Sequence, residues 1–449
     1  MAKVNPRGFT LNLMRLLLPP LLLLSFASAL AQTTAQIAPP AVMTLHDLNY
    51  AEPLGEDLYM NSGATGLVLV VVRGNQVFFH GYGETAPGSQ RVPSEASVIR
   101  LCSLTKTFTA DVLAKLAAQG VVHLGDPLQK YMPENMTLPA EDSAITLEEL
   151  ATHTSGLTRE IGTAPRNTPH FTYPDFETRW RWLQTTEPKF TPGTQALYSN
   201  VGFDLLSDAL AVATHTSYAT LLETRTLRPL RMWDTTFYPT AEQCLQLMQS
   251  AHRQGPCTST EGTQGSSGLY STPADMAKWL QYLVGPGTPA LPAHPDGVHA
   301  VYLLPSSLTS EYGLSHAGRP AGIGLAWLHL GANTDISHII EKTGGGAGFT
   351  TYIAIHPASH TALFVAMTDG PHGWKPGFNL FKASNNALLD LAGLPPLHGA
   401  PQRRIAERHI VRRTRRVRVR QTRPTAPRAV RVAQRSIATS TADASQSQR

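Results

Sequence analysis

The sequence predicts an α/β fold in which segments from both ends of the chain form one antiparallel sheet and the middle of the chain is mostly helical. Apolar, β-branched runs separated by short turns occur at residues 66–83 and again at 323–368, which is typical of antiparallel strands. Between these regions, apolar residues recur at helical spacing. A last helical pattern, at 377–391, follows the final predicted strand.

The first predicted strands form a hairpin over residues 66–83. Residues 67–72 are a continuous β-branched run, and Gly74 and Asn75 supply the turn to the returning strand. A strand without polar residues indicates burial on both faces of the sheet.

Four helices are predicted in the middle of the chain, over residues 104–119, 146–151, 201–213 and 273–283. Thr146 and Glu149 form a capping box, and Thr272 followed by Pro273 is typical of a helix start. We interpret His153 as a residue that packs against a helix end, with a catalytic base as the alternative. Residues 158–192, rich in Pro, Thr and Arg, form a long excursion that could wall a cleft.

The last folded third alternates strands and turns. Strands are predicted over residues 323–330, 337–342, 349–355 and 362–368. Turns of two to six residues join them, so we expect antiparallel pairing, with the hairpin at 66–83 as a neighbour in the same sheet.

The N-terminus has the pattern of a secretory signal peptide over residues 1–31. An apolar run at 16–26 is preceded by three basic residues, Lys3, Arg7 and Arg15. It is followed by small residues up to Ala31. The run is shorter than the roughly 20 residues of a membrane-spanning helix. We therefore expect cleavage after Ala31 and a periplasmic protein, with an uncleaved signal anchor as the alternative.

The C-terminus, residues 401–449, has a different composition. It holds 14 Arg against Glu407 and Asp443, and no aromatic residue. Such a segment buries too little apolar surface to fold alone, so it is predicted to be a disordered tail, with weak docking on anionic envelope surfaces as a further role. The domain between the two ends, residues 32–400, carries 20 basic against 30 acidic residues. The basic character of the chain therefore lies in its ends.

Three cysteines are present. Cys244 and Cys257 flank a polar loop that an exported chain can close as a disulfide, although the sequence leaves their pairing open. Cys102 lies between apolar neighbours and is interpreted as a buried, inert thiol rather than a nucleophile.

The strongest candidate nucleophile is Ser103, which lies where an apolar strand meets the first turn of the predicted helix. A serine hydroxyl needs a base within hydrogen-bond reach before it attacks a carbonyl. Lys106 is three positions away, on the same helical face. Its amine acts as a base only if burial or a second cation lowers its pKa. A second cation further along the chain is therefore a feature to look for.

Two further motifs follow in order along the chain. Tyr198-Ser-Asn200 precedes a predicted helix, and its Tyr and Asn, two positions apart, would face the same side of an extended segment. Lys342-Thr343-Gly344 closes a predicted strand and leads into a glycine-rich turn. The glycines are followed by a strand rather than a helix, which argues against a phosphate cradle. No metal-binding motif occurs, and we predict no cofactor.

The same order of motifs is found in a known family. Ser-x-x-Lys, Tyr-x-Asn and Lys-Thr-Gly in this order resemble the serine penicillin-recognising family of β-lactamases and penicillin-binding proteins, in its class C β-lactamase and carboxypeptidase/endopeptidase branch. The resemblance covers nearly all of residues 45–395 but not the Arg-rich tail. It rests on Ser62-Gly-Ala-Thr-Gly66, Tyr82-Gly-Glu-Thr85, Ala151-Thr-His-Thr-Ser155, Tyr198-Ser-Asn200, Asp234-Thr-Thr-Phe237, Gln243-Cys244 and Lys342-Thr-Gly-Gly-Gly346.

This resemblance implies a β-lactamase/transpeptidase-like fold and a role for each motif residue. Ser103 would attack the carbonyl and Lys106 would take its proton. Tyr198 would relay protons to the leaving amine. Lys342 would be the second cation, a catalytic residue that holds Tyr198 and Lys106 in useful protonation states. The substrate would be bound by Asn200, which orients its amide, by Thr343, which with Lys342 attracts its carboxylate, and by Gly345, whose backbone N–H would share the oxyanion with that of Ser103.

The implied function is a D-alanyl-D-alanine carboxypeptidase/endopeptidase that acts on peptidoglycan stem peptides and binds penicillin covalently. A class C-like β-lactamase or an esterase on the same scaffold is the first alternative, and a non-catalytic cell-wall binding protein is the second. The expected partners are peptidoglycan peptides and β-lactams. We expect a monomer and no nucleic-acid partner.

Overall fold

The computed structural model describes residues 43–397, apart from positions 135, 137, 140–144, 253, 287–293 and 332–334. The predicted signal peptide and Arg-rich tail both lie outside the described residues. Among the described residues, no helix has the length and apolar character needed to cross a membrane.

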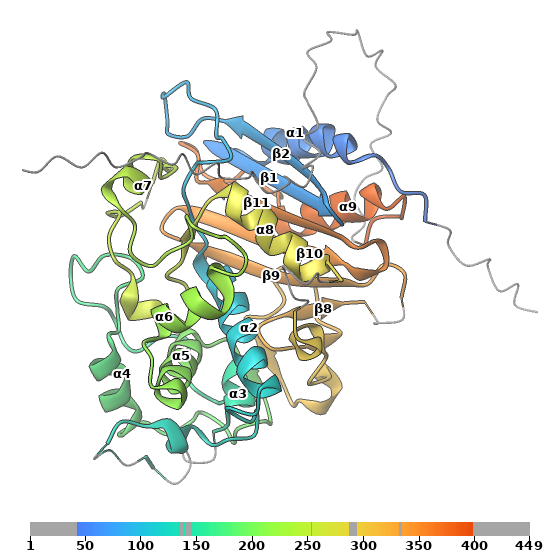
Figure 1. The fold of residues 1–449 in the computed structure, drawn as a ribbon. Helices are drawn as coiled ribbons and strands as arrows, with labels where there is room; N and C mark the ends of the chain where they lie inside the picture. The colour runs from blue at the N-terminus through green and yellow to red at the C-terminus, as the bar shows by residue number, and fades with distance from the viewer. Residues whose placement is uncertain are drawn as a thin grey trace, which may run out of the picture. The chain divides into compact units, whose positions relative to one another are not determined.

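A seven-stranded antiparallel sheet dominates the fold (Figure 1), in the order β2-β1-β11-β10-β9-β8-β7. Its strands are β1 (Gly66–Arg73), β2 (Gln76–Gly83), β7 (Gly322–Ile323), β8 (Leu328–Leu330), β9 (Ile339–Gly346), β10 (Phe349–His356) and β11 (Thr361–Thr368). The predicted hairpin is β1 and β2, and β1 pairs with β11 over Leu67 to Arg73. The prediction that both ends of the folded chain share one sheet is therefore confirmed.

The strand β1 is buried on both faces, as its continuous apolar run predicts. Val68 and Val70 belong to one hydrophobic core, whereas Leu67 and Leu69 belong to another on the opposite face. The helices α1 (Ala51–Ser62) and α9 (Leu380–Leu391) contribute to the second core, and α2 (Thr105–Ala118) and α8 (Pro273–Val284) contribute to the first. The sheet is thus covered by helices on both sides (Figure 1).

The segment predicted as one strand over 323–330 is in fact two short strands. Ala326 adopts a left-handed φ of 66° between them, and Gly324 N donates to Trp327 O at 2.8 Å. The chain therefore turns at this point, although its composition is that of a strand. The next strand was predicted to end at residue 342, but β9 continues to Gly346. Its glycines pair with β10.

Helices are the main regular elements in the middle of the chain, as predicted. Besides α2 and α8, they are α3 (Leu147–Ala151), α4 (Phe176–Leu183), α5 (Asn200–Thr214), α6 (Tyr218–Leu222) and α7 (Ala241–Leu245). The capping box of Thr146 and the cap of Thr272 are both present. Short strands β3 (Ile99–Arg100) and β5 (Tyr270–Ser271) pair with each other, as do β4 (Ala196–Leu197) and β6 (Glu311–Tyr312).

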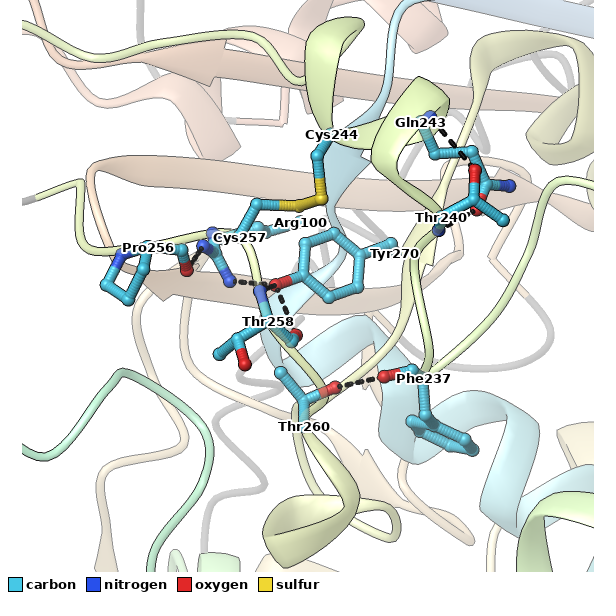
Figure 2. Close-up of a disulfide and its surroundings, with 10 residues drawn as sticks. All are labelled: Arg100, Phe237, Thr240, Gln243, Cys244, Pro256, Cys257, Thr258, Thr260 and Tyr270. Atoms are coloured by element: carbon cyan, nitrogen blue, oxygen red, sulfur yellow. Dashed lines mark hydrogen bonds between the residues drawn. A yellow bond between two sulfur atoms is a disulfide. The ribbon is translucent and has the colours of Figure 1, made fainter.

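Cys244 and Cys257 form a disulfide with an S–S distance of 2.07 Å, and the loop between them is attached to the strand that leads to the candidate nucleophile (Figure 2). Arg100 of β3 donates to Pro256 O and to the Tyr270 hydroxyl, both at 2.6 Å. Both residues of β3 are buried, and the two hydrogen bonds of Arg100 hold the strand in position.

Candidate active site

Ser103 lies in the short 3₁₀ turn η2 (Cys102–Leu104), which joins β3 to α2. Leu101 and Leu104 are fully buried and anchor the turn, while Ser103 retains 7% exposure. Cys102 has a left-handed φ of 53°, and burial raises the pKa of its thiol to about 12. The interpretation of Cys102 as a buried, inert thiol is therefore supported.

Lys106 is fully buried one turn further along α2, with its Nζ 3.4 Å from Ser103 Oγ. The amine also donates to Asn200 Oδ1 at 2.6 Å and to Ser266 O at 2.9 Å. Burial lowers the pKa of Lys106, and the charge of Lys342 lowers it further, against the opposing effect of Tyr198. The amine is therefore both close to the hydroxyl and adjusted towards a neutral base.

Tyr198 follows β4 and is surrounded by cations. Lys106 Nζ lies 4.9 Å from the centre of its ring, Lys342 Nζ 5.0 Å, and Arg159 Cζ 4.7 Å. Burial alone would raise the pKa of Tyr198, but Lys106 and Lys342 outweigh this effect and lower the pKa to about 7. The phenol can therefore exchange its proton near neutral pH.

Asn200 is the first residue of α5, and Ser199 caps that helix by accepting from Gly202 N. Ser199 itself is extended, with φ −128° and ψ 119°, so the backbone between Tyr198 and Asn200 has the extended geometry that the sequence predicted. Both side chains contact Lys106.

The strand β9 carries Lys342 and Thr343 and places the Lys342 amine beside Tyr198. Lys342 is almost fully buried and its Nζ donates to Thr343 O at 3.0 Å. A Cβ on Gly344 would lie 2.9 Å from Leu101 O and 3.2 Å from Ser103 N, so only glycine allows β9 to approach the nucleophile turn this closely. Thr351 Oγ1 donates to Leu101 O at 2.8 Å and joins β10 to the same turn.

Gly345 is the next residue of β9 and pairs with Thr350 across the strands. A Cβ on it would meet only Phe349 O, at 3.8 Å, so this side of the backbone is open. The residues predicted for the site thus lie on three segments, 103–106, 198–200 and 342–345. Contacts of Lys106 with Asn200 and of Lys106 and Lys342 with the Tyr198 ring bring these segments together.

Several residues of this site carry no recognisable signal of their own in the sequence. Arg159 contacts the Tyr198 ring, Glu160 accepts a hydrogen bond from Asn200 Nδ2, and the Ser266 carbonyl accepts from Lys106. Asp204 accepts from both the backbone N and the hydroxyl of Ser266. All four residues lie outside the three sequence motifs. For Arg159 and Glu160, the nearby turn at His153 is a sequence feature that could have pointed to them.

His153 is a support for the site rather than a base. Its ring stacks on Tyr198 at 4.4 Å, and its Nδ1 accepts from Ser199 N at 3.1 Å. Burial, together with the charges of Lys106 and Lys342, lowers the pKa of His153 well below its usual value. The ring is therefore neutral and holds the segment that carries Tyr198.

The residues from 50 to 378 match the family model described as Beta-lactamase. The chain belongs to the β-lactamase family. This serine hydrolase family and its β-lactamase/transpeptidase-like fold were both predicted from the motifs, and both are confirmed.

Relatives of this β-lactamase family member cover most of its length. It is 38% identical to the D-alanyl-D-alanine-carboxypeptidase/endopeptidase AmpH of Escherichia coli K12, over 82% of this chain and 96% of that protein. A β-lactamase/D-alanine carboxypeptidase from Yersinia pestis is also 38% identical, with a TM-score of 0.72 over 76% of this chain and 97% of that chain. A D-alanine carboxypeptidase AmpC from Burkholderia cenocepacia, 21% identical with a TM-score of 0.59 over 77% of this chain and 97% of that chain, shares the fold.

Proposed function

We propose that this protein is a D-alanyl-D-alanine carboxypeptidase/endopeptidase that acts on peptidoglycan stem peptides through an acyl-serine. The observation that carries the proposal is the 3.4 Å approach of the buried Lys106 amine to Ser103 Oγ beside a phenol of lowered pKa. The similarity to AmpH over 96% of its length supports the choice of substrate.

In the acylation step, Ser103 Oγ attacks the carbonyl of the penultimate D-alanine and its proton passes to the amine of Lys106. The tetrahedral intermediate then collapses. The carbon–nitrogen bond to the terminal D-alanine breaks, and Tyr198 delivers a proton to the leaving amine. The product is a serine ester. In the second step, water attacks this ester and gives a proton to Tyr198. The bond to Ser103 Oγ then breaks, the shortened peptide leaves, and Lys106 returns its proton to Ser103.

The charge that develops on the carbonyl oxygen would be stabilised by the backbone N–H groups of Ser103 and Gly345. Loss of one such donor typically raises the barrier by about 2.7 to 4 kcal/mol. Lys342 and Thr343 would bind the carboxylate of the substrate, because a buried ammonium forms a strong charge-assisted hydrogen bond with an anion. Asn200 would orient both Lys106 and the substrate amide.

The decisive experiment incubates the purified protein with a pentapeptide that ends in D-Ala-D-Ala and follows the products by mass spectrometry. Release of one D-alanine per peptide is expected, and a cross-linked dimeric peptide tests the endopeptidase activity in parallel. Ser103→Ala is the control. A folded wild-type protein that leaves both peptides intact would contradict the proposal.

Penicillin provides a second test, because we propose that it acylates the same serine. A covalent adduct on Ser103 that disappears in Ser103→Ala would exclude a non-catalytic cell-wall binding protein. Rapid hydrolysis of a chromogenic cephalosporin without peptidase activity would favour the β-lactamase alternative, and turnover of simple esters alone would favour an esterase.

We further propose that the chain is exported to the periplasm by residues 1–31 and that residues 401–449 dock on anionic envelope surfaces. Their opposite patterns, apolar at one end and Arg-rich at the other, support these roles. A variant that lacks 401–449 should keep its turnover but lose binding to anionic lipid vesicles at low salt. Equal binding of both proteins would contradict the role of the tail.

A further inference from the structure

A three-residue segment after the His153 turn is attached to the start of α5. Ser199 Oγ donates to Thr158 O at 2.7 Å, and Asn200 N donates to Arg159 O at 2.9 Å. The Asn200 side chain completes the attachment, because its Nδ2 donates to Glu160 Oε1. Residues 158–160 therefore lie directly beside the side chain that holds Lys106.

The amide of Asn200 has partners of opposite character at its two ends. Its Oδ1 accepts from the Lys106 amine at 2.6 Å, and its Nδ2 donates to the carboxylate of Glu160. An ionised carboxylate only accepts hydrogen bonds. A rotation of the amide by 180° would therefore set its oxygen against the Glu160 oxygen and its N–H groups against the donor Lys106. Only one orientation satisfies both partners.

We propose that Glu160 is a positioning residue that holds the Asn200 amide with its oxygen towards Lys106. This inference rests on the proposed function, in which Lys106 takes the proton of Ser103. As it does so, the amine becomes an ammonium, and an oxygen acceptor at 2.6 Å stabilises that charge. An amide turned the other way would present N–H groups to the new charge and would slow acylation.

The role is separable from folding, because Glu160 is exposed. Among the described residues, Asn200 is the only side chain that donates a hydrogen bond to its carboxylate. Removal of this carboxylate should therefore leave the fold intact. Its main effect should appear in the acylation rate constant, with a smaller effect on the binding of the substrate, whose amide Asn200 also orients.

The test compares the variants Glu160→Ala and Glu160→Gln with the wild-type enzyme, using a fluorescent penicillin and the D-Ala-D-Ala pentapeptide. E160A should reduce the acylation rate constant by about ten- to a hundred-fold, with a smaller rise in the KM for the peptide. E160Q should remain within about three-fold of wild type, because its amide oxygen still accepts from Asn200 Nδ2. Glu177→Ala, which removes an exposed acid on α4, is the matched control and should have no effect.

If penicillin acylates the wild type and E160A at equal rates, the inference is wrong. It is also wrong if E160Q is as slow as E160A, because the charge of Glu160, rather than the orientation of Asn200, would then matter. If the wild type fails to release D-alanine, the proposed function is contradicted, but the penicillin acylation rates of the variants still test the inference.

Hydrogen exchange of the Asn200 side-chain amide, followed by NMR, tests the inference without any turnover. Exchange should be slow in wild type and E160Q and fast in E160A, and equal rates in all three would contradict the inference.

Discussion

Lys342 Nζ lies 5.0 Å from the centre of the Tyr198 ring, so a cation from the last third of the chain faces a phenol from its middle. Lys106 approaches the same ring at 4.9 Å. Lysine amines beside a buried phenol favour its ionised form when they are protonated. This relationship explains how a tyrosine can act as a proton carrier near neutral pH.

Removal of Lys342 should therefore change the pH dependence of the reaction. With two cations the pKa of Tyr198 is about 7, although burial opposes this value. Lys342→Ala removes one of the cations, so the pKa of Tyr198 should rise. The alkaline limb of the acylation rate on the peptide, where Tyr198 has no proton left for the leaving amine, should therefore move to higher pH. Ultraviolet titration of tyrosinate measures the shift, with Tyr198→Phe as the baseline. An unchanged titration would show that Lys342 does not act on the phenol.

Replacement of Lys106 by Arg should abolish acylation even though the positive charge is retained. A guanidinium remains protonated at all accessible pH values and cannot take the proton of Ser103. We expect a loss of about 10² to 10⁴ in the rate of penicillin labelling, as for Lys106→Ala. Lys115→Arg, on the same helix but paired with Asp111, is the control and should be fully active. Strong labelling of K106R would refute Lys106 as the base.

The close approach of β9 to the nucleophile turn predicts different effects at two neighbouring glycines. Gly344→Ala would bring a Cβ to 2.2 Å from Thr351 Oγ1 and 2.9 Å from Leu101 O, and should lower the free energy of unfolding by about 1 to 3 kcal/mol. Gly345→Ala meets only Phe349 O at 3.8 Å and should change it by less than about 0.5 kcal/mol. Urea denaturation of both variants measures the difference, and similar losses would contradict the packing argument.

The disulfide should contribute to stability through the loop that it closes. Cys244 and Cys257 are 13 residues apart, and a loop of this size is worth about 3 kcal/mol in the chain-entropy model. The double variant Cys244→Ala, Cys257→Ala should unfold at a lower urea concentration than the oxidised protein. Addition of a reductant should lower the midpoint of the wild type to that of the variant and leave the variant unchanged. Equal midpoints for oxidised wild type and variant would exclude a stabilising bond.

Much of the fold could be predicted because its signals are local. The run at 67–72 and the turn at Gly74 specify a hairpin, and Thr146 with Glu149 specifies a helix start. The turn between β7 and β8 was not predicted. Ala326 has a left-handed φ there, and tertiary packing rather than residue type imposes it. An alanine carries no signal for that conformation.

The sequence by itself determined the sheet that joins both ends, the order of the three motifs and the identity of Ser103 and Lys106 as a pair, because each depends on spacing along the chain. Only the tertiary structure decided what surrounds that pair. Arg159 and Glu160 lie on an irregular segment, and a side chain there gains its partners from long-range packing rather than from periodicity. The lowered pKa of Tyr198 has the same origin, since it depends on the distances to two amines that separate segments supply.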